Sequence, residues 1–189
     1  MTGKTHWTLG LASGLTVFLS ASAPEYSPAT LAVAMTGSYL FSLIPDLDQE
    51  ASSFWSSIPY GRVAGKIVDP IVKHRNISHS ILGLAIFGFL LRLLIQSFPE
   101  YWGLNIELVF WIAIVAYSSH LLADMFTVEG IPLFYPYKRA VGLPPKPFEG
   151  IRIISGQWFE NLIIYPIINV YLILFLYLNL DRLKSIIFK

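Results

Sequence analysis

Five apolar stretches, separated by shorter polar segments, dominate the pattern of this chain. They cover residues 7–23, 30–44, 80–98, 106–122 and 161–180. A helix needs roughly 20 mainly apolar residues to cross a bilayer, and the last three stretches come nearest to this. The first is the weakest because glycine, serine and threonine interrupt it, although small residues also let membrane helices pack closely. The pattern predicts an all-α integral membrane protein, a bundle of about five transmembrane helices, or four if a weak stretch does not cross.

The composition agrees with a membrane protein. Hydrophobic residues make up 54% of the 189 residues and charged residues only 13%, whereas soluble domains have about 25% charged residues. The length suits a single membrane-embedded domain over residues 1–189. The absence of cysteine excludes a disulfide framework and a thiolate metal site. The net charge of +1 provides no strongly basic surface, so no nucleic-acid partner is expected. The oligomeric state stays open.

The first apolar stretch also resembles a secretory signal peptide. Lys4 precedes it, and the small residues Ala-Ser-Ala at 21–23 fit a cleavage site. Two features oppose cleavage: Pro24 would directly follow the cut, and Gly10 interrupts the apolar run. We therefore expect this stretch to remain as a helix.

Lysine and arginine orient the bundle, because cytoplasmic loops of membrane proteins are rich in them. With five crossings, the side of the N-terminus carries nine basic residues: Lys4, Arg62, Lys66, Lys73, Arg75, Lys138, Arg139, Lys146 and Arg152. The other side carries three, all in the C-terminal tail: Arg182, Lys184 and Lys189. The side of the N-terminus is therefore predicted to face the cytoplasm, in the cell (inner) membrane. The basic tail would fit better if the first or the fifth stretch did not cross.

All four histidines fall on this predicted cytoplasmic side, together with three aspartates at helix ends. The set consists of His6 before the first helix, Asp46 and Asp48 after the second, His74 and His79 before the third, and His120 and Asp124 in the last turns of the fourth. A single histidine in a membrane helix is usually an interhelical hydrogen-bonding residue, and a single aspartate at a helix end is often a cap. Because all four histidines gather at one face, and ionisable residues in such segments are functional by default, the set favours one shared site.

The local geometry supports a shared site. His120 and Asp124 are four residues apart and therefore lie on one face of a helix. Pro45 should end the second helix and leave Asp46 and Asp48 on an extended turn. Alternate residues of an extended segment point to opposite sides, so one aspartate would bind an ion and the other would hold a histidine in place.

The two histidines of the third motif need a bend between them. His74 and His79 are five residues apart, which is about 140° around a helix. They reach a common point more easily if His74 lies in the loop and Ser78 caps a helix that His79 opens.

Imidazole and carboxylate ligands without thiolate suit zinc, and also manganese or iron(II). The candidate metal ligands are His6, Asp46, Asp48, His74, His79, His120 and Asp124. They exceed the three protein ligands of a typical catalytic zinc, and they suffice for two ions about 3.5–4 Å apart, as in known hydrolases. The sequence thus predicts a divalent metal cofactor of one or two ions, with zinc the first choice.

Four motifs follow one another along the chain: THWTLG at 5–10, PDLDQ at 45–49, HRNISHS at 74–80 and SHLLADMFTVEGIPLFYP at 119–136. Together they resemble the YdjM/YbcI-type family of membrane-bound, proposed metal-dependent hydrolases, some of which are described as LexA-regulated inner-membrane proteins. The resemblance covers residues 1–140 well and the last fifty poorly, and it implies the same seven polar residues as a signature. Family members often read H-R-G-x-T-H-S where this chain has Asn76 and Ser78, and neither difference removes a candidate ligand.

In ligand order alone, the chain is also similar to the zinc phospholipase C and P1 nuclease group, where Asp, His and H-x-x-x-D bind zinc. This similarity makes phosphoester hydrolysis a candidate reaction. The candidates for catalytic roles are Asp46, Asp48 and Arg75. The planar guanidinium of Arg75 suits a substrate phosphate, and a surface role as a cytoplasmic arginine is the alternative. The loop 131–159, rich in proline and aromatic residues, would lie at the membrane interface and cover the site.

Three functions compete. The leading interpretation is a membrane metal-dependent hydrolase that acts on a phosphoester or other ester of a lipid or lipid-linked molecule. A metal-ion or proton transporter is the first alternative, although its binding residues would be expected near the midplane of the membrane. A metal-stabilised structural or partner-binding membrane protein is the second, and its metal site would be closed by protein ligands. Arg92, in the third stretch, is interpreted as structural, either packed against another helix or extended along the helix toward the membrane surface.

Overall fold

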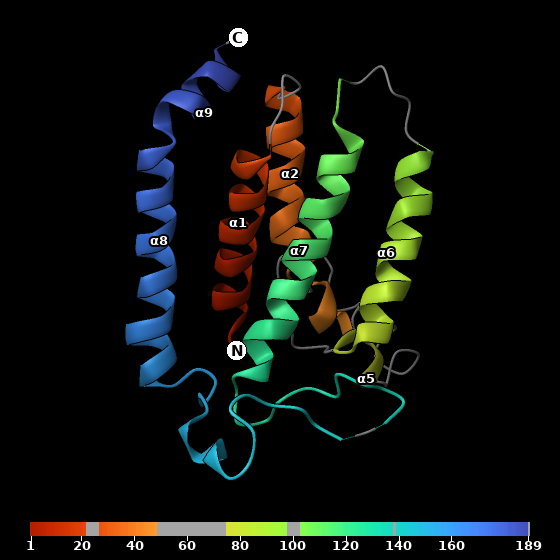
Figure 1. Cartoon of the computed structure of the whole chain (residues 1–189), viewed down its shortest axis with the longest axis vertical. Coiled ribbons are helices and arrows are strands. Elements are labelled where there is room, and N and C mark those ends of the chain that lie inside the picture. Colours follow the sequence, from red (N-terminus) through yellow and green to blue (C-terminus); the bar gives the residue numbers. More distant parts are fainter. Residues whose placement is uncertain (22–26, 49–74, 98–102, 138, 189) are drawn as a thin grey trace, which may run out of the picture.

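The computed structural model describes residues 1–21, 27–48, 75–97, 103–137 and 139–188. Five longer helices run side by side and alternate in direction (Figure 1): α1 (Gly3–Ser20), α2 (Pro28–Phe41), α6 (Ile81–Gln96), α7 (Ile106–Met125) and α8 (Tyr165–Leu178). The shorter elements are η1 (Ile44–Asp48), α5 (Arg75–Ser78), η3 (Phe148–Ile151), the π-helical turn η4 (Glu160–Ile164) and α9 (Leu180–Ile187). The prediction of an all-helical bundle is confirmed.

Several of these helices have the length and composition of membrane spans. Among the described residues, three segments are long and apolar enough to cross a bilayer: Pro28–Asp46, Ile106–Met125 and Glu160–Leu178. Helix α6 is apolar over 16 residues, and α1 has 18 residues. Apolar side chains of α8 point outward, with Ile173 64% and Leu178 77% exposed. An apolar surface of this extent suits contact with lipid rather than water.

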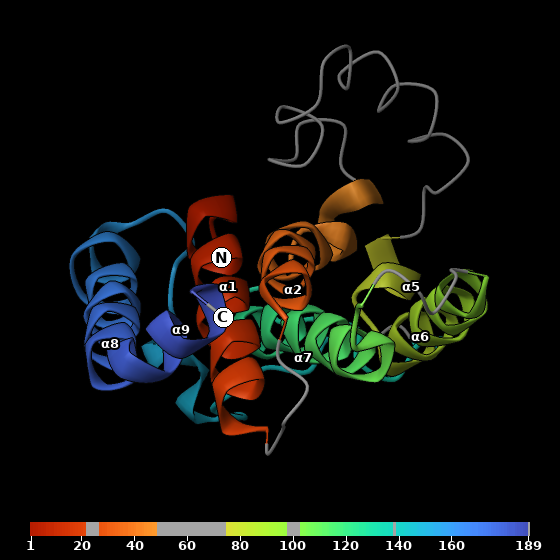
Figure 2. The same cartoon turned by 90° about the horizontal axis from the view of Figure 1, so that it is seen from above.

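Helices α1, α2 and α7 form the centre of the bundle. Seen along the helices, α8 packs beside α1, and α6 packs beside α7 on the opposite flank (Figure 2). Phe18 of α1, Ala34 of α2 and Ile112 of α7 meet in one buried apolar cluster. The three central helices therefore fix the relative heights of the segments that carry five of the candidate ligands. These are His6 in α1, Asp46 and Asp48 in η1 directly after α2, and His120 and Asp124 in α7.

Small residues bring α1 and α2 unusually close. A methyl group at Gly10 would lie 2.4 Å from Cβ of Ser42, and one at Gly14 would lie 1.9 Å from Oγ of Ser38. Gly10 and Gly14 are four residues apart along the chain, and so are Ser38 and Ser42. The two contacts therefore lie one above the other along one line, as small residues do between membrane helices. This approach places the first turns of α1, with His6, beside the end of α2.

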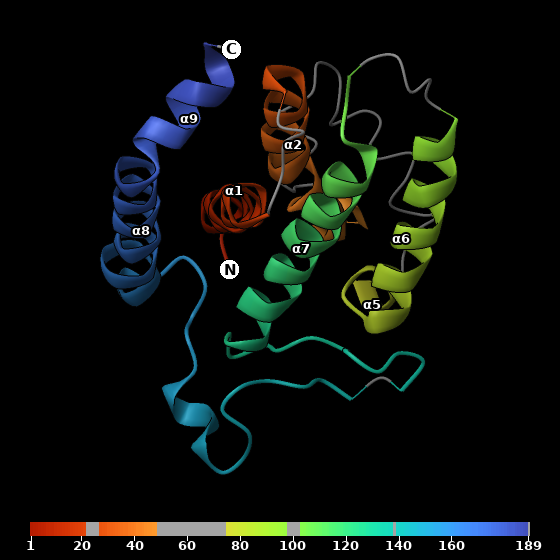
Figure 3. The same cartoon turned by 45° about the horizontal axis from the view of Figure 1, so that its top comes forward.

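The segments 126–137 and 139–159 pass across the helix ends at the N-terminal side of the bundle (Figure 3). Backbone hydrogen bonds fasten them: Leu143 N donates to Met125 O at 2.7 Å, and Ile81 N donates to Leu133 O at 3.0 Å. A β-bridge joins Thr127 to Ile153. The predicted interfacial loop is thus held against the ends of α6 and α7.

The prediction that Ser78 caps the third apolar helix is wrong. Ser78 ends the short helix α5, and α6 begins at Ile81 with Ser80 as its N-cap. The hydroxyl of Ser80 accepts from the backbone N–H of Gly83 at 3.1 Å, which is the usual N-cap contact. His79 therefore lies in the turn between two helices rather than opening α6.

The extended turn predicted after Pro45 is also wrong. Residues Ile44–Asp48 form a 3₁₀ turn in which Asp46 N donates to Leu43 O at 3.1 Å. Proline has no N–H to donate and its φ angle suits the first turn of a helix, so it starts this turn instead of forcing an extended one.

Arg92 packs against another helix, as predicted. Its guanidinium forms an ion pair with Glu107 of α7 and lies 5.2 Å from the ring centre of Phe110. These contacts tie α6 to α7 at the end of the bundle away from the N-terminus.

Candidate metal centre

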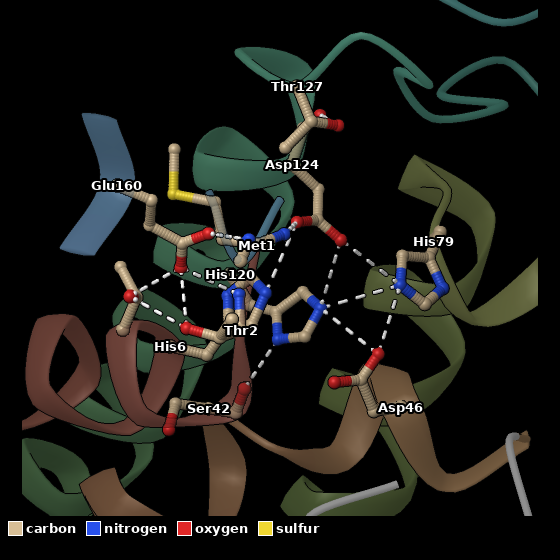
Figure 4. Close-up of polar contacts among 12 residues, drawn as sticks. Met1, Thr2, His6, Ser42, Asp46, His79, His120, Asp124, Thr127 and Glu160 are labelled. Carbon is tan, nitrogen blue, oxygen red and sulfur yellow. Dashed lines mark hydrogen bonds and ion pairs between the residues drawn. The ribbon is translucent and has the colours of Figure 1, made fainter. Parts of the chain in front are cut away.

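Five of the predicted ligands come together at the end of the bundle where the N-terminus lies (Figure 4). They are His6 from α1, Asp46 from η1, His79 from the turn before α6, and His120 and Asp124 from α7. All three histidines are buried, with exposed fractions of 0–3%. The two carboxylates keep about 15% of their side-chain surface exposed. Four separate segments of the chain thus supply one buried cluster.

A backbone carbonyl orients His120. Nδ1 of His120 lies 2.6 Å from the carbonyl oxygen of Ser42. Because a carbonyl oxygen only accepts, Nδ1 must donate, and Nε2 of the neutral ring then carries the free lone pair. Histidines that bind metals typically have their second nitrogen fixed in this way.

Two triangles of side-chain atoms, which share the pair His79 and His120, have the spacing of metal ligands. Nε2 of His79 and Nε2 of His120 are 3.4 Å apart. Oδ1 of Asp46 lies 3.6 Å from both nitrogens, and Oδ2 of Asp124 lies 3.5 and 3.6 Å from them. Each aspartate thus makes a nearly equilateral triangle with the two histidines. Ligand atoms at ~2.0–2.2 Å from a tetrahedral ion are themselves roughly 3.3–3.6 Å apart, so these residues fit a divalent ion.

His6 has no hydrogen bond although it is fully buried. Neither ring nitrogen has a hydrogen-bond partner among the described residues, and its ring stacks on that of His120 with centroids 3.6 Å apart. Nε2 lies 3.2 Å from Oδ1 of Asp124, which also forms an ion pair with the amino group of Met1. A buried polar nitrogen without a hydrogen bond is costly, and a metal ion would be a suitable acceptor of its lone pair.

The carboxylates control the protonation of His79. Burial by itself would lower the pKa of the His79 imidazole, but the neighbouring side chains of Asp124 and Asp46 outweigh burial and raise this pKa to about 9. A cation at Nε2 of His79, whether a proton or a metal ion, is therefore stabilised by the two aspartates.

A carboxylate that the sequence interpretation missed supports α1. Glu160 is fully buried. Its Oε1 accepts from Thr2 N at 2.7 Å and from the hydroxyls of Thr2 and Thr5 at 2.6 Å each. Its Oε2 accepts from Gly156 N at 2.7 Å. Glu160 thus fastens the first turn of α1, one turn from His6, to the turn that begins the last apolar helix. The signal in the sequence was a lone carboxylate opening an apolar run.

The structure does not describe the side chains of the three remaining predicted site residues. His74 lies outside the described residues. The backbone of Asp48 lies in η1 and that of Arg75 in α5, but neither side chain is described. The roles predicted for these three, and the binding of a metal by the other five, stay predictions.

A cavity of about 470 Å³ opens onto the cluster. Asp46, His79 and Asp124 form one part of its wall, and Glu129 and Pro132 from the loop form another. The loop turns at Gly130, which has φ +64° and lies so close to the carbonyl of Val141 that a methyl group there would be 2.6 Å from its oxygen. The cluster is therefore accessible to a small polar group from the loop side.

Comparison with known proteins places the chain in a family. The chain is 30% identical over 164 residues to the Bacillus subtilis (strain 168) protein named uncharacterized protein YvsG, covering 87% of this chain and 88% of that protein. It is 33% identical over 110 residues to the inner membrane protein YdjM of Escherichia coli (strain K12), covering 56% of this chain and 50% of that protein. No solved structure matches the chain. The family described as YdjM inner membrane protein matches residues 1–185, so the chain belongs to this family of membrane proteins.

Proposed function

We propose that this protein is an integral-membrane, metal-dependent hydrolase that cleaves a phosphoester or other ester in a lipid or lipid-linked substrate. The observation that carries the proposal is the triangle of Asp46, His79 and His120, whose ligand atoms are 3.4–3.6 Å apart beside an accessible cavity. A closed structural metal site would leave no such access to two of its ligands.

The residues of this triangle have complementary tasks. His120, and His79 once it has lost its proton, would provide nitrogen ligands and Asp46 would provide negative charge, while the carbonyl of Ser42 keeps His120 aimed inward. A divalent ion held by them would act as a Lewis acid on the ester and activate water for attack. Glu129, in the cavity wall, offers a carboxylate that would take the proton from the attacking water. Arg75 is proposed to bind a substrate phosphate.

The position of the cavity favours a lipid substrate. Its wall is formed by residues at the ends of apolar helices, so a headgroup at the membrane surface would reach the cluster while its chain stays in the bilayer. A second cavity of about 490 Å³ lies between α2, α6 and α7 and has apolar walls that include Val33, Leu94 and Val109. This cavity offers room for part of an acyl or isoprenoid chain. The nine basic residues that the sequence pattern assigns to this side support a cytoplasmic site.

The test is reconstitution of the purified protein in liposomes, with hydrolysis and metal flux measured on the same samples. Lipid phosphoesters of increasing chain length serve as substrates, beside their soluble analogues. We expect metal-dependent hydrolysis that is greater for the lipid forms and is lost on Asp46→Asn. Asp181→Asn is the matched control, because Asp181 is fully exposed on α9 at the other end of the bundle.

Two outcomes would contradict the proposal. Metal or proton flux that disappears in Asp46→Asn, without hydrolysis of any ester offered, would identify a transporter. Tightly bound metal with neither hydrolysis nor flux would identify a structural metal site.

A further inference from the structure

The two oxygens of Asp124 face different partners. Oδ2 lies 3.5 Å from Nε2 of His120 and 3.6 Å from Nε2 of His79. Oδ1 points instead to His6, whose Nε2 is 3.2 Å away. A carboxylate with its two oxygens in separate ligand groups has the arrangement of a bridge between two ions.

The stacking of His6 on His120 sets the distance between the two positions. The rings are nearly parallel, with an interplanar angle of 12° and centroids 3.6 Å apart. Both Nε2 atoms lie at the same end of the stack, since each is within 3.5 Å of an oxygen of the same carboxylate. Ions bound along these two nitrogens would therefore be separated by about the thickness of the stack. Paired ions in hydrolases are about 3.5–4 Å apart.

An ordinary hydrogen bond does not explain why His6 lies so close to Asp124. Its Nε2 is 3.2 Å from Oδ1 of Asp124, yet neither ring nitrogen makes a hydrogen bond of acceptable geometry among the described residues. Two ligands of one ion show this combination, because each lone pair is directed at the ion and not at the other ligand. The amino group of Met1 also forms an ion pair with Oδ1 of Asp124, so an ion bound at this oxygen would take the place of that amino group.

We propose that the site holds two divalent ions bridged by Asp124. The first position lies between His79, His120 and Oδ2 of Asp124, with Asp46 beside the same two histidines, and the second is formed by His6 and Oδ1 of Asp124. With fewer protein ligands, the second position would be completed by water or by an oxygen of a phosphoester, and it would lose its ion more easily. This inference rests on the proposed function, because it divides the same cluster into two positions.

The experiment counts ions in wild-type protein reconstituted with manganese and in two variants, His6→Ala and His6→Gln. Elemental analysis gives the number of ions per chain, and electron paramagnetic resonance shows whether two manganese ions are coupled. Thr8→Val is the control, because Thr8 is buried on the same helix and, among the described residues, its hydroxyl bonds only to the carbonyl of Lys4 in that helix.

We expect two coupled ions in the wild type and in Thr8→Val, and one uncoupled ion in both His6 variants. One uncoupled ion in the wild type, retained in the His6 variants, would overturn the two-ion inference and leave the proposed metal site standing. No bound ion in the wild type would overturn the proposed function as well. If the His6 variants do not fold, the wild-type count and spectrum decide the question.

Discussion

Nδ1 of His120, on the fourth long helix, donates a hydrogen bond of 2.6 Å to the backbone carbonyl of Ser42, at the end of the second. This contact joins two central helices at the cluster and sets which nitrogen of His120 faces Asp46, His79 and Asp124. The carbonyl is free to accept because it lies at a helix end, where the last carbonyls have no partner within the helix. Packing of α2 against its neighbours therefore controls the chemistry of His120.

Close packing of α1 on α2 should be needed for metal binding. Gly14→Ala would place a methyl group 1.9 Å from Oγ of Ser38, so we expect a destabilisation of about 1–3 kcal/mol and a lower metal affinity as His6 and Ser42 shift. Thermal unfolding in detergent and metal titration measure the two effects. Adding Ser38→Ala removes the nearest atom and should restore part of both. Gly150→Ala, where the new methyl group meets nothing within 4 Å, should change neither.

Glu160 should act on the site through α1. Glu160→Gln replaces a buried carboxylate that accepts from Thr2, Thr5 and Gly156, and hydrogen bonds to charged groups contribute about 1.5–3 kcal/mol each. We expect lower thermal stability and weaker metal binding. The exposed Glu149→Gln, which loses only an ion pair with Lys146 at 3.6 Å, should have little effect. If Glu160→Gln and Glu149→Gln had the same thermal stability and the same metal affinity, Glu160 would have no positioning role.

Metal affinity should rise with pH up to about 9. The folded-state pKa of His79 is raised from 6.5 to about 9 by Asp124 and Asp46, against the effect of burial. Binding of a metal to His79 must therefore displace a proton at any pH below about 9. Calorimetry in buffers of different ionisation enthalpy measures this proton release. The stability of the metal-free fold should depend on pH in the opposite direction. Protonation of His79 stabilises the fold fully below pH 6.5, and this contribution is lost as the pH rises through about 9. Metal binding without proton release at pH 7.5 would contradict this assignment.

Glu129 should be needed for hydrolysis but not for metal binding. Its carboxylate lies in the wall of the cavity, outside the cluster of ligand atoms. General bases typically contribute about 10²–10⁴-fold to a rate, so Glu129→Gln should lower hydrolysis by about 10²-fold or more with unchanged metal content. A loss of metal in this variant would instead make Glu129 a ligand, and an unchanged rate would remove it from the mechanism.

Much of the site could be predicted, because the order of the apolar stretches alone decides at which end of the bundle each polar residue lies. Once five helices alternate in direction, His6, His79 and His120 must fall at one end of the bundle, whatever the details of packing. The spacing of His120 and Asp124 gave the further information that they share a helix face. These two patterns are local and survive differences in how the helices are rotated.

Features that depend on tertiary contacts could not be predicted in the same way. The contact of His120 with Ser42 requires the rotation of α7 against α2, which no local pattern encodes. Glu160 is far from α1 in the sequence, so its hydrogen bonds to Thr2 and Thr5 are visible only in the fold. Serine is a favourable N-cap residue, so residue type alone does not distinguish Ser78 from Ser80. In the structure Ser80, after the turn at His79, is the N-cap of α6.

The central claim is that the cluster binds a metal ion, and the most direct measurement is the metal content of wild-type and His120→Ala protein purified without chelator. Ser119→Ala, next to it on α7, is the control, because in the described part of the chain the Ser119 hydroxyl bonds only to Ala116 O within its own helix. We expect at least one divalent ion per chain in the wild type and in Ser119→Ala. We expect none in His120→Ala, with membrane insertion unchanged, since a ligand at a helix end adds little to the apolar surface that inserts the helix. A wild-type protein that binds no ion, or a His120→Ala variant that keeps the wild-type content, would contradict the account.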